Sequence, residues 1–420
     1  MKSYFFSLAL LPVCCAQAET LEEALEHAVS QNHLIKSAKA DTEASKQQLY
    51  SAQNQRLPAL NINSGYTQLS EAPAAKTQIE GQSAQFVTAQ AGSAQAQAIA
   101  TLPIFTSGRI SHNINASEAS LSAVQHNEIT TALTIKMQVA EVYLSVLRAQ
   151  SALQLAQSHA ETLQAHAADV DRLHSQGMVS KNDQLAAEVE YANARQLVVQ
   201  SGNRLDIAKA QYNRLLNRRL DDSVELEDRF PASPDGAPDE LNAQALVQRP
   251  ELNALTNQIT TLQEQAQSVQ ASLLPQVAVN GGYQYQENRF QAFEGMWMVN
   301  VGMEWKLDGG THHQSKSLHR QALALQAQRD DLAGMIGLEI RRAWLDIQET
   351  EKRIDVSKQA IAQADENLRV NQERYRQGLS SQTEMLKAEE LRMTTHDNFN
   401  NAHYDAAQAK LSLRRALGVL

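Results

Sequence analysis

The sequence predicts a mainly α-helical protein that also contains β-strands and is built from two copies of one structural plan. Its 420 residues include only 17 Gly and 9 Pro, and 5% are aromatic, which is typical of long helices and not of a compact α/β domain. Apolar residues recur every seven positions over long stretches. Shorter stretches between them alternate between polar and apolar residues, which indicates strands.

Residues 1–18 are predicted to form a signal peptide that is removed after Ala18. Lys2 supplies the positive charge, residues 4–15 form an apolar run, and Ala16-Gln17-Ala18 has the small-x-small pattern of a cleavage site. This apolar run is too short to span a bilayer as a helix. The mature protein is therefore expected to be exported across the inner membrane.

The chain has two cysteines, Cys14 and Cys15, and both lie inside the predicted signal peptide. Cleavage after Ala18 would leave no thiol for a disulfide, although an exported protein could form one. A lipid-anchored cysteine is the alternative. Simple cleavage is favoured over acylation, because Pro12 and Val13 occupy positions where a lipobox needs small residues.

Charge and hydropathy exclude two classes of protein. Lys and Arg number 37 against 47 Asp and Glu, and a net charge of −10 argues against nucleic acid as a partner. After the signal peptide, no stretch is apolar enough for a transmembrane helix. If the mature chain crosses a membrane, it must do so with strands.

An internal duplication organises the mature chain. Residues 61–66 resemble residues 278–283 at an offset of 217, whereas Gly177 matches Gly378 at an offset of 201. The shift between these offsets places a longer loop in the first copy, over residues 69–95. The predicted division is therefore a first repeat at 19–220, a proline-rich linker at 221–239 and a second repeat at 240–420.

Each repeat is predicted to end in a long helical hairpin, at residues 108–216 and 310–417. An unbroken seven-residue apolar repeat indicates a left-handed coiled-coil seam. The second repeat shows this pattern most clearly, at Ile340, Ile347, Ile354, Ile361, Leu368 and Tyr375. A weaker version of the pattern lies 201 residues earlier, in the first repeat. The first helix of each hairpin should be about 100 Å long at 1.5 Å per residue.

The turn of each hairpin contains glycine and is followed by Ser-x-x-Asp or Ser-x-x-Glu. Glycine suits a left-handed helix C-cap, and a serine with a carboxylate three residues later suits a capping box at the start of the return helix. The turns comprise Gly177, Met178, Val179 and Ser180 in the first copy, and Gly378, Leu379, Ser380 and Ser381 in the second. The carboxylates are Asp183 and Glu384.

Strands are predicted at about residues 57–68, 96–105, 275–286 and 296–306. Polar and apolar residues alternate over about ten residues, as in transmembrane β-barrel strands. The alternation is weakest in 96–105, which is mostly Ala and Gln. These strands are too few to close a pore alone. Two interpretations remain: half-buried strands of a soluble protein, or strands of an oligomer that shares one barrel.

Taken in order, these features resemble the TolC-like outer-membrane factor family over essentially the whole mature chain. No single motif is specific, and the duplicated order of the motifs carries the resemblance. The motifs are the leading helix at 21–30, Leu57-Pro58 opening a strand, Leu102-Pro103-Ile104-Phe105 before Gly108, the Gly-x-x-Ser-x-x-Asp/Glu-x-Leu turns at 177–185 and 378–386, and Ala416-Leu417-Gly418 near the end.

The resemblance implies a homotrimer in the outer membrane of a Gram-negative cell. Each protomer would contribute four strands to a shared twelve-stranded barrel and its long helices to a periplasmic α-barrel. The function implied is a passive export duct, for small molecules or for type I secretion. It would open when a periplasmic adaptor and an inner-membrane transporter dock at the hairpin turns.

In that interpretation Asp183 and Glu384 line the tunnel entrance, in addition to a capping role. Some relatives carry another acidic residue three positions after the turn carboxylate. Here those positions hold Ala186 and Lys387, which argues against a doubled acidic ring.

Chemical motifs for catalysis are absent from the sequence, which lacks a Walker A motif and a Gly-x-Ser-x-Gly elbow. We therefore expect no enzyme activity and no cofactor. His312, His313 and His319 are interpreted as solvated side chains and not as a metal site, because no cysteine or carboxylate pair completes a ligand set. The alternative function is a periplasmic coiled-coil adaptor, which would lack barrel strands.

Overall fold

A computed structural model describes residues 18–79 and 81–420, and the predicted signal peptide, apart from Ala18, lies outside them. Within the described residues, eight helices and six strands follow one another in two series. The first series is α1 (Leu21–Gln31), α2 (His33–Asn54), β1 (Ala59–Gln68), β2 (Ala74–Ile79), β3 (Gln82–Val87), β4 (Gly92–Phe105), α3 (Arg109–Ser175) and α4 (Lys181–Leu215). The second is α5 (Pro238–Gln248), α6 (Pro250–Ala271), β5 (Gln276–Gln286), β6 (Gly295–Glu304), α7 (Gly309–Arg376) and α8 (Gln382–Leu417).

Two compact units divide the chain, and each unit contains parts of both sequence repeats. The strand unit comprises residues 39–127 and 251–332, and the helical unit comprises the described residues up to 38 together with 128–250 and 333–420. The two repeats are therefore visible in the sequence, but they are not separate compact units of the structure. Each compact unit contains residues from both repeats.

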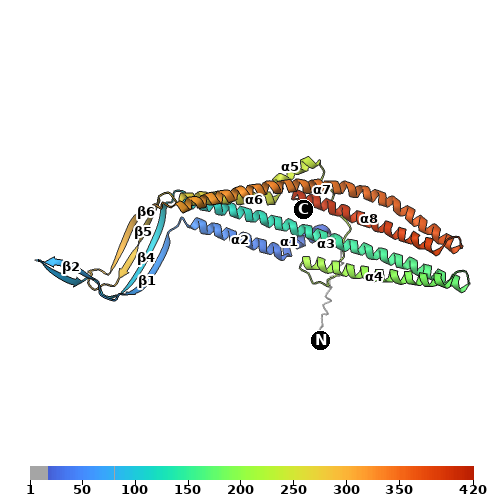
Figure 1. Cartoon of the computed structure of the whole chain (residues 1–420), viewed down its shortest axis with the longest axis horizontal. Helices are drawn as coiled ribbons and strands as arrows, with labels where there is room; N and C mark the ends of the chain where they lie inside the picture. Colours follow the sequence, from blue (N-terminus) through green and yellow to red (C-terminus); the bar gives the residue numbers. More distant parts are fainter. Residues whose placement is uncertain (1–17, 80) are drawn as a thin grey trace, which may run out of the picture. The chain divides into compact units, whose positions relative to one another are not determined.

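The main sheet of the strand unit has the order β1-β4-β5-β6, with antiparallel neighbours (Figure 1). Each repeat supplies two of these strands, and β4 pairs with β5 across the repeats. The predicted strand positions agree with these four within a few residues, and the weakest one, β4, is longer than expected because it begins at Gly92. Its Ala and Gln side chains have low intrinsic strand preference, so pairing with β1 and β5 on both sides decides its length.

Pairing register sorts the main sheet into an apolar face and a polar face. Residues that pair directly share a face, and Tyr283 pairs with Trp297 while Asn280 pairs with Asn300. One face carries Leu60 and Ile62 of β1, Leu102 of β4, Val279 and Tyr283 of β5, and Trp297, Val299 and Val301 of β6. The other carries mainly Asn, Gln, Thr, Ala and Gly. Trp297 is 81% exposed and Val299 is 80% exposed, so the apolar face is uncovered within the single chain.

The longer connection of the first copy, residues 69–95, contains strands that the sequence analysis did not predict. It holds the antiparallel hairpin β2-β3 and the first residues of β4. The hairpin register runs from Ala74 opposite Val87 to Ile79 opposite Gln82, and Gly81 in its turn has a φ of 84°. Gly tolerates that left-handed conformation without steric cost. The polar composition of this segment did not indicate strands, because β2 and β3 are stabilised by pairing with each other.

In the helical unit, a core of large side chains joins α1, α3, α4 and α8. Tyr143 and Tyr212 have no exposed surface and their rings meet edge to face, with centroids 6.1 Å apart. The other members of this core include Leu21, Ile135, Val139, Leu216 and Leu411. Figure 1 shows the two long hairpins, α3-α4 and α7-α8, each closed by a short turn. The predicted hairpins agree with these helices in position.

The predicted coiled-coil seam is buried along only part of each long helix. On α7, the predicted members Ile340, Ile347, Leu368 and Tyr375 are buried, whereas Ile354 and Ile361 between them are half-buried. A straight α-helix drifts by about 20° per heptad relative to a strict seven-residue repeat. On α3 the buried positions in the second half of the helix include Leu163 and Val170, three residues after the heptad positions, so the seven-residue pattern located the seam but not every residue in it.

Glu19, which precedes α1, is bonded to residues near the middle of the sequence. The Glu19 carboxylate accepts two hydrogen bonds from the Arg218 guanidinium, at 2.8 and 2.6 Å, and one from the Tyr212 hydroxyl at 2.9 Å. The Tyr143 hydroxyl donates to the carbonyls of Glu19 and Glu227. Burial alone would raise the pKa of Glu19, but the bonds from Arg218 and Tyr212 outweigh burial and lower it.

Glu19→Gln should therefore destabilise the helical unit in a pH-dependent way. Because the folded state lowers the pKa of Glu19, its stabilising contribution is present above the unfolded value and is lost as pH falls through the folded value. We expect the melting temperature of the variant, followed by circular dichroism at 222 nm, to lie below that of the parent at pH 7. The gap should shrink at pH 3. A gap of equal size at both pH values would contradict the assigned role of the carboxylate.

Candidate functional site: the polar sheet face, the strand-to-helix junction and the hairpin turns

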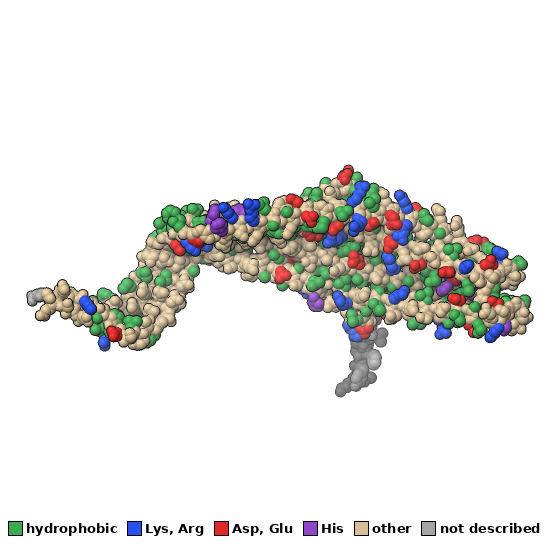
Figure 2. Space-filling model, viewed as in Figure 1, with side chains coloured by type: hydrophobic (Ala, Val, Ile, Leu, Met, Phe, Trp, Pro, Cys, Tyr) green, Lys and Arg blue, Asp and Glu red, His purple; other side chains and the backbone are tan. Residues whose placement is uncertain are grey.

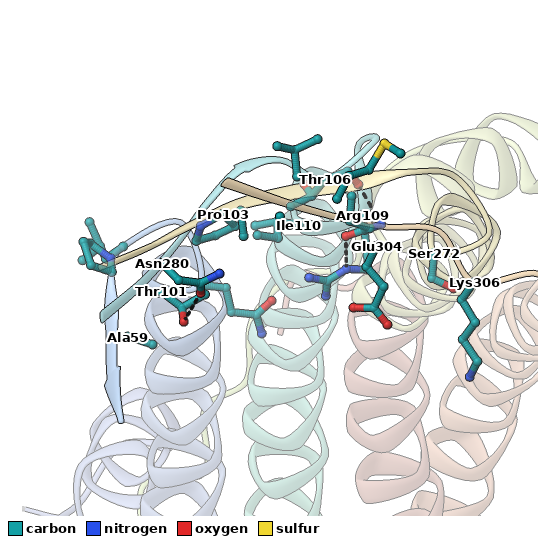
Figure 3. A pocket seen from close by; sticks show the side chains of 18 of the residues that line it. Ala59, Thr101, Pro103, Thr106, Arg109, Ile110, Ser272, Asn280, Glu304 and Lys306 are labelled. Carbon is teal, nitrogen blue, oxygen red and sulfur yellow. Dashed lines mark hydrogen bonds between the residues drawn. The ribbon is translucent and has the colours of Figure 1, made fainter. Parts of the chain in front are cut away.

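The polar face of the main sheet carries a hydrogen-bonded row of side chains across three strands. The Thr101 hydroxyl donates to the Asn280 side-chain oxygen at 2.7 Å, and the Asn280 amide donates to the Asn300 oxygen at 3.1 Å. Figure 3 shows Thr101 and Asn280 joined in this way. These groups are neutral and retain capacity for further hydrogen bonds. Such a face suits contact with water and polar solutes.

A cavity of about 860 Å³ lies where the strands meet the helices of the strand unit. Its lining includes the Thr101–Asn280 pair, Arg109 at the start of α3, and Glu304 and Lys306 at the end of β6 (Figure 3). The Arg109 side chain donates to Gln276 at 3.1 Å, which secures the start of α3 against β5. Charged groups are thus concentrated at the helix end of an otherwise neutral polar face.

Each hairpin turn follows the same hydrogen-bonding scheme, a Schellman motif. In the first turn, the Gly177 amide donates to the His174 carbonyl and the Met178 amide to the Leu173 carbonyl, at 2.8 and 2.9 Å. The second turn repeats this scheme one copy later, where Gly378 donates to Tyr375 and Leu379 to Arg374. The φ angles of Gly177 and Gly378 are 75° and 73°, in the left-handed region that only glycine adopts without cost.

Both return helices begin with the predicted capping box. The Asp183 amide donates to the Ser180 hydroxyl at 3.2 Å, and the Asp183 carboxylate accepts from the Ser180 amide at 3.2 Å. Ser381 and Glu384 make the equivalent pair of bonds, at 3.3 and 3.1 Å. The two carboxylates therefore complete the helix starts, as the capping interpretation predicted.

The Glu384 carboxylate also accepts a hydrogen bond from the Ser380 hydroxyl at 2.7 Å. That bond, with the one from the Ser381 amide, lowers the pKa of Glu384. Glu384 is consequently an anion at neutral pH. The role of Asp183 and Glu384 at a tunnel entrance remains a prediction.

Met178 and Leu379 project from corresponding positions of the two turns and are 62% and 65% exposed. Val179, the next residue of the first turn, is half-buried. It packs against the cluster of Val170, Ala187 and Tyr375, which joins α3, α4 and α7. The apolar surface of the first turn is therefore smaller than its sequence indicates, because the return helix folds Val179 inward.

The sequence did not predict a buried ionic cluster that lies between α3 and α8. Glu389 has no exposed surface, and its carboxylate contacts His159 at 2.8 Å and Arg392 at 2.9 and 3.0 Å. Burial would raise the pKa of Glu389, but the bonds from His159 and Arg392 outweigh it and lower the pKa. Its counterpart in the first copy, Glu188, is exposed. No local pattern distinguishes the two, because burial of Glu389 depends on the distant α3.

Metal ligation is not supported by the geometry. Among residues 18–79 and 81–420, no group of three or more His, Cys, Asp or Glu side chains is placed to hold a metal ion. His312 and His313 are neighbours with ring centroids 6.0 Å apart. In the described part of the chain no helix combines the length and the apolar character needed to cross a membrane.

A sheet with one apolar and one polar face, joined to duplicated helical hairpins about 100 Å long, defines the class of tunnel-forming outer-membrane channels. The family model described as outer membrane efflux protein matches residues 24–218 and 241–419, and the chain belongs to this family. It is an outer-membrane efflux channel and not an enzyme. The alternative of a periplasmic adaptor was wrong. A comparison with curated protein sequences finds no match.

Solved structures of outer-membrane channels share this fold. The outer-membrane channel OprN is 20% identical with a TM-score of 0.79, and the match covers 95% of this chain and 89% of OprN. VceC from Vibrio cholerae is 17% identical with a TM-score of 0.79, covering 95% and 96%. CmeC from Campylobacter jejuni is 14% identical with a TM-score of 0.79, covering 95% and 85%. The predicted TolC-like fold is confirmed.

Replacing Gly177 and Gly378 with Ala should destabilise the hairpin turns locally. A Cβ atom would meet nothing within 4 Å at either position, so the cost is the left-handed backbone itself, about 1–2 kcal/mol per residue. Hydrogen exchange followed by mass spectrometry should show faster exchange in the peptides around both turns. Gly202→Ala, inside α4 with nothing within 4 Å, is the matched control and should slow exchange or leave it unchanged. Unchanged exchange at the turns would contradict the strain argument.

Proposed function

We propose that this chain forms a homotrimer in which the main sheets of three copies close one twelve-stranded barrel in the outer membrane and the long helices form a tunnel into the periplasm. The observation that carries this proposal is the register of the main sheet. It places Val279, Tyr283, Trp297, Val299 and Val301 on one face and Asn280, Gln284 and Asn300 on the other, where Met296 and Met298 are the apolar exceptions. The apolar face suits lipid and the polar face suits a water-filled lumen.

The edges of the main sheet support assembly. Within the described chain, β1 and β6 each pair with a single strand of that sheet. Unpaired backbone groups at such an edge are costly in hydrocarbon, so a membrane sheet needs closure. In a symmetric ring, β6 of one copy would pair with β1 of the next. Three copies of four strands give a lumen wider than one sheet could enclose.

Exposed apolar side chains on the helices of the helical unit also support assembly. Val199 is 73% exposed, Val356 69% and Leu338 60%. Exposed apolar side chains of this size are available for contacts with other protein chains. Contacts between protomers would bury these side chains.

Trimer formation is the test of this proposal. Native mass spectrometry of the detergent-extracted protein should give a species of three chains, and cross-linking in the membrane should stop at the same number. A heat-denatured sample is the control and should give single chains. A stable, water-soluble monomer would overturn the proposal.

The duct would belong to a tripartite export pump, in which a periplasmic adaptor docks on the hairpin turns and an inner-membrane transporter supplies the energy. Two features support the turns as the docking surface. Met178 and Leu379 present exposed apolar side chains there. The turns also lie at the ends of the hairpins, where few packed helices resist movement. Docking would shift an equilibrium between closed and open entrances. Asp183 and Glu384 would place negative charge at that entrance.

Neutralising the turn carboxylates should weaken cation selectivity. In planar bilayers, Asp183→Asn with Glu384→Gln should lower the cation-to-anion permeability ratio by about two- to threefold, because charge rings at a constriction set ion preference. The control pair Asp206→Asn and Asp355→Asn removes as many exposed carboxylates from α4 and α7, away from the turns. If both pairs change selectivity equally, the turns do not form the entrance.

A further inference from the structure

The first three turns of α7 carry a basic stripe, which we define as His312, His313, Lys316, His319 and Arg320. All of these side chains are exposed. Residues 309–329 contain no Asp or Glu, so no carboxylate of the same segment offsets the stripe. Figure 2 shows histidine and cationic side chains gathered next to hydrophobic ones over the start of α7.

Helical periodicity places the basic stripe on one side of α7. At 100° per residue its members fall within an arc of about 120°, and Leu323, which is 59% exposed, lies in the same arc. A second side packs inside the strand unit, where the Ser315 hydroxyl donates to the Ala266 carbonyl at 3.0 Å and Ala322 is buried.

A third side of α7 is exposed and neutral, with Gln314, Ser317 and Gln321. Its chemistry matches the Asn, Gln and Gly residues of the polar sheet face. The basic stripe with Leu323 resembles the apolar sheet face in exposing a large hydrocarbon side chain. The neutral side therefore fits the lumen, and the basic stripe fits the outer surface of the tunnel.

The basic stripe follows directly after the end of the membrane-type sheet. β6 ends at Glu304, and Trp305 and Leu307 are 57% and 76% exposed before α7 begins at Gly309. At 1.5 Å per residue, the stripe spans about 4–17 Å from the start of the helix. The headgroup layer is about 5–8 Å thick on each side of the hydrocarbon, and charges act about 8 Å beyond it at physiological ionic strength.

The hairpin fold does not require these charges. In the first copy, the equivalents of His312, Lys316, His319 and Arg320 are Ser111, Asn115, Glu118 and Ala119. The equivalent of His313 is His112, which contacts the Glu264 carboxylate at 2.8 Å and so has an acidic partner within the strand unit. The basic stripe is specific to the second copy, which calls for an explanation outside helix packing.

We propose that the basic stripe binds the phosphate groups of anionic phospholipids in the periplasmic leaflet of the outer membrane. Lys316 and Arg320 attract the anionic surface, and imidazole N–H groups donate to phosphate oxygens. Trp305 and Leu307 insert at the adjoining interface, where an aromatic ring and a hydrocarbon chain are favoured. The inference rests on the proposed orientation of the sheet, with the helices on the periplasmic side.

Tryptophan quenching by brominated lipids tests this proposal. Full-length protein carrying Trp297→Phe and Trp344→Phe retains Trp305 as the reporter at the end of β6. It is reconstituted into vesicles that contain brominated phosphatidylglycerol or brominated phosphatidylcholine. Quenching of Trp305 gives the relative binding constant of the two lipids. This constant is measured for the reporter protein and for the same protein that also carries Lys316→Gln and Arg320→Gln. The control pair Lys352→Gln and Lys358→Gln removes two cations about 50 Å further along α7.

We expect phosphatidylglycerol to be favoured in the parent, and the preference to fall by about fivefold or more when Lys316 and Arg320 are replaced. The control pair should leave it unchanged. Equal quenching by both lipids in the parent, or a preference that survives the replacement, would overturn the proposal. In the latter case the cations would face the lumen or an acidic protein. Absence of quenching by either lipid would instead contradict the membrane placement of the sheet, and with it the proposed function.

Discussion

A β-sheet in hydrocarbon must satisfy every backbone N–H and C=O group by pairing, and this constraint governs the architecture of the chain. Four antiparallel strands with two open edges cannot meet it alone. The chain supplies a sheet whose register separates apolar from polar side chains, and closure of this sheet by other copies is part of the proposed function. Because the strands enter and leave the sheet at the same end, the helices must all continue from that end.

The two repeats share a backbone plan but differ in the side chains that interact. The hairpin turns are nearly equivalent, with the same Schellman hydrogen bonds and the same capping box. By contrast, Glu389 is buried against His159 and Arg392, while Glu188 is exposed. Backbone geometry is retained because each hairpin needs the same turn, whereas side chains have diverged because each copy contacts different surroundings.

The ionic cluster around Glu389 links the two repeats within the helical unit. His159 belongs to α3 and Glu389 to α8, so the bonds cross from one copy to the other. A buried carboxylate bonded to a guanidinium and an imidazole resists separation, because removing Arg392 leaves the negative charge without compensation in a low dielectric. The Glu19–Arg218 pair has a similar effect next to the start of α1. Both pairs oppose separation of the segments that they join.

Much of the candidate site was predictable because its signals are local. Gly177 and Gly378 need left-handed backbone, and Ser180 with Asp183, like Ser381 with Glu384, satisfies amides within one turn. Residues far apart along the chain were not predictable in this way. Val179 turns inward only because Val170 and Tyr375 lie beside it, and β2-β3 forms from residues that look like a polar loop.

The sequence by itself determined the duplication, the long helices, the four strands of the main sheet and the chemistry of the turns, because each depends on periodicity or on residues within a few positions. The tertiary structure alone decided the register that joins β4 to β5, the burial of Glu389, the anchoring of Glu19 and the exposure of the basic stripe on α7. Each of these depends on contacts, or on their absence, between segments more than a hundred residues apart. Such contacts are set by packing and backbone pairing, to which no local pattern in the sequence corresponds.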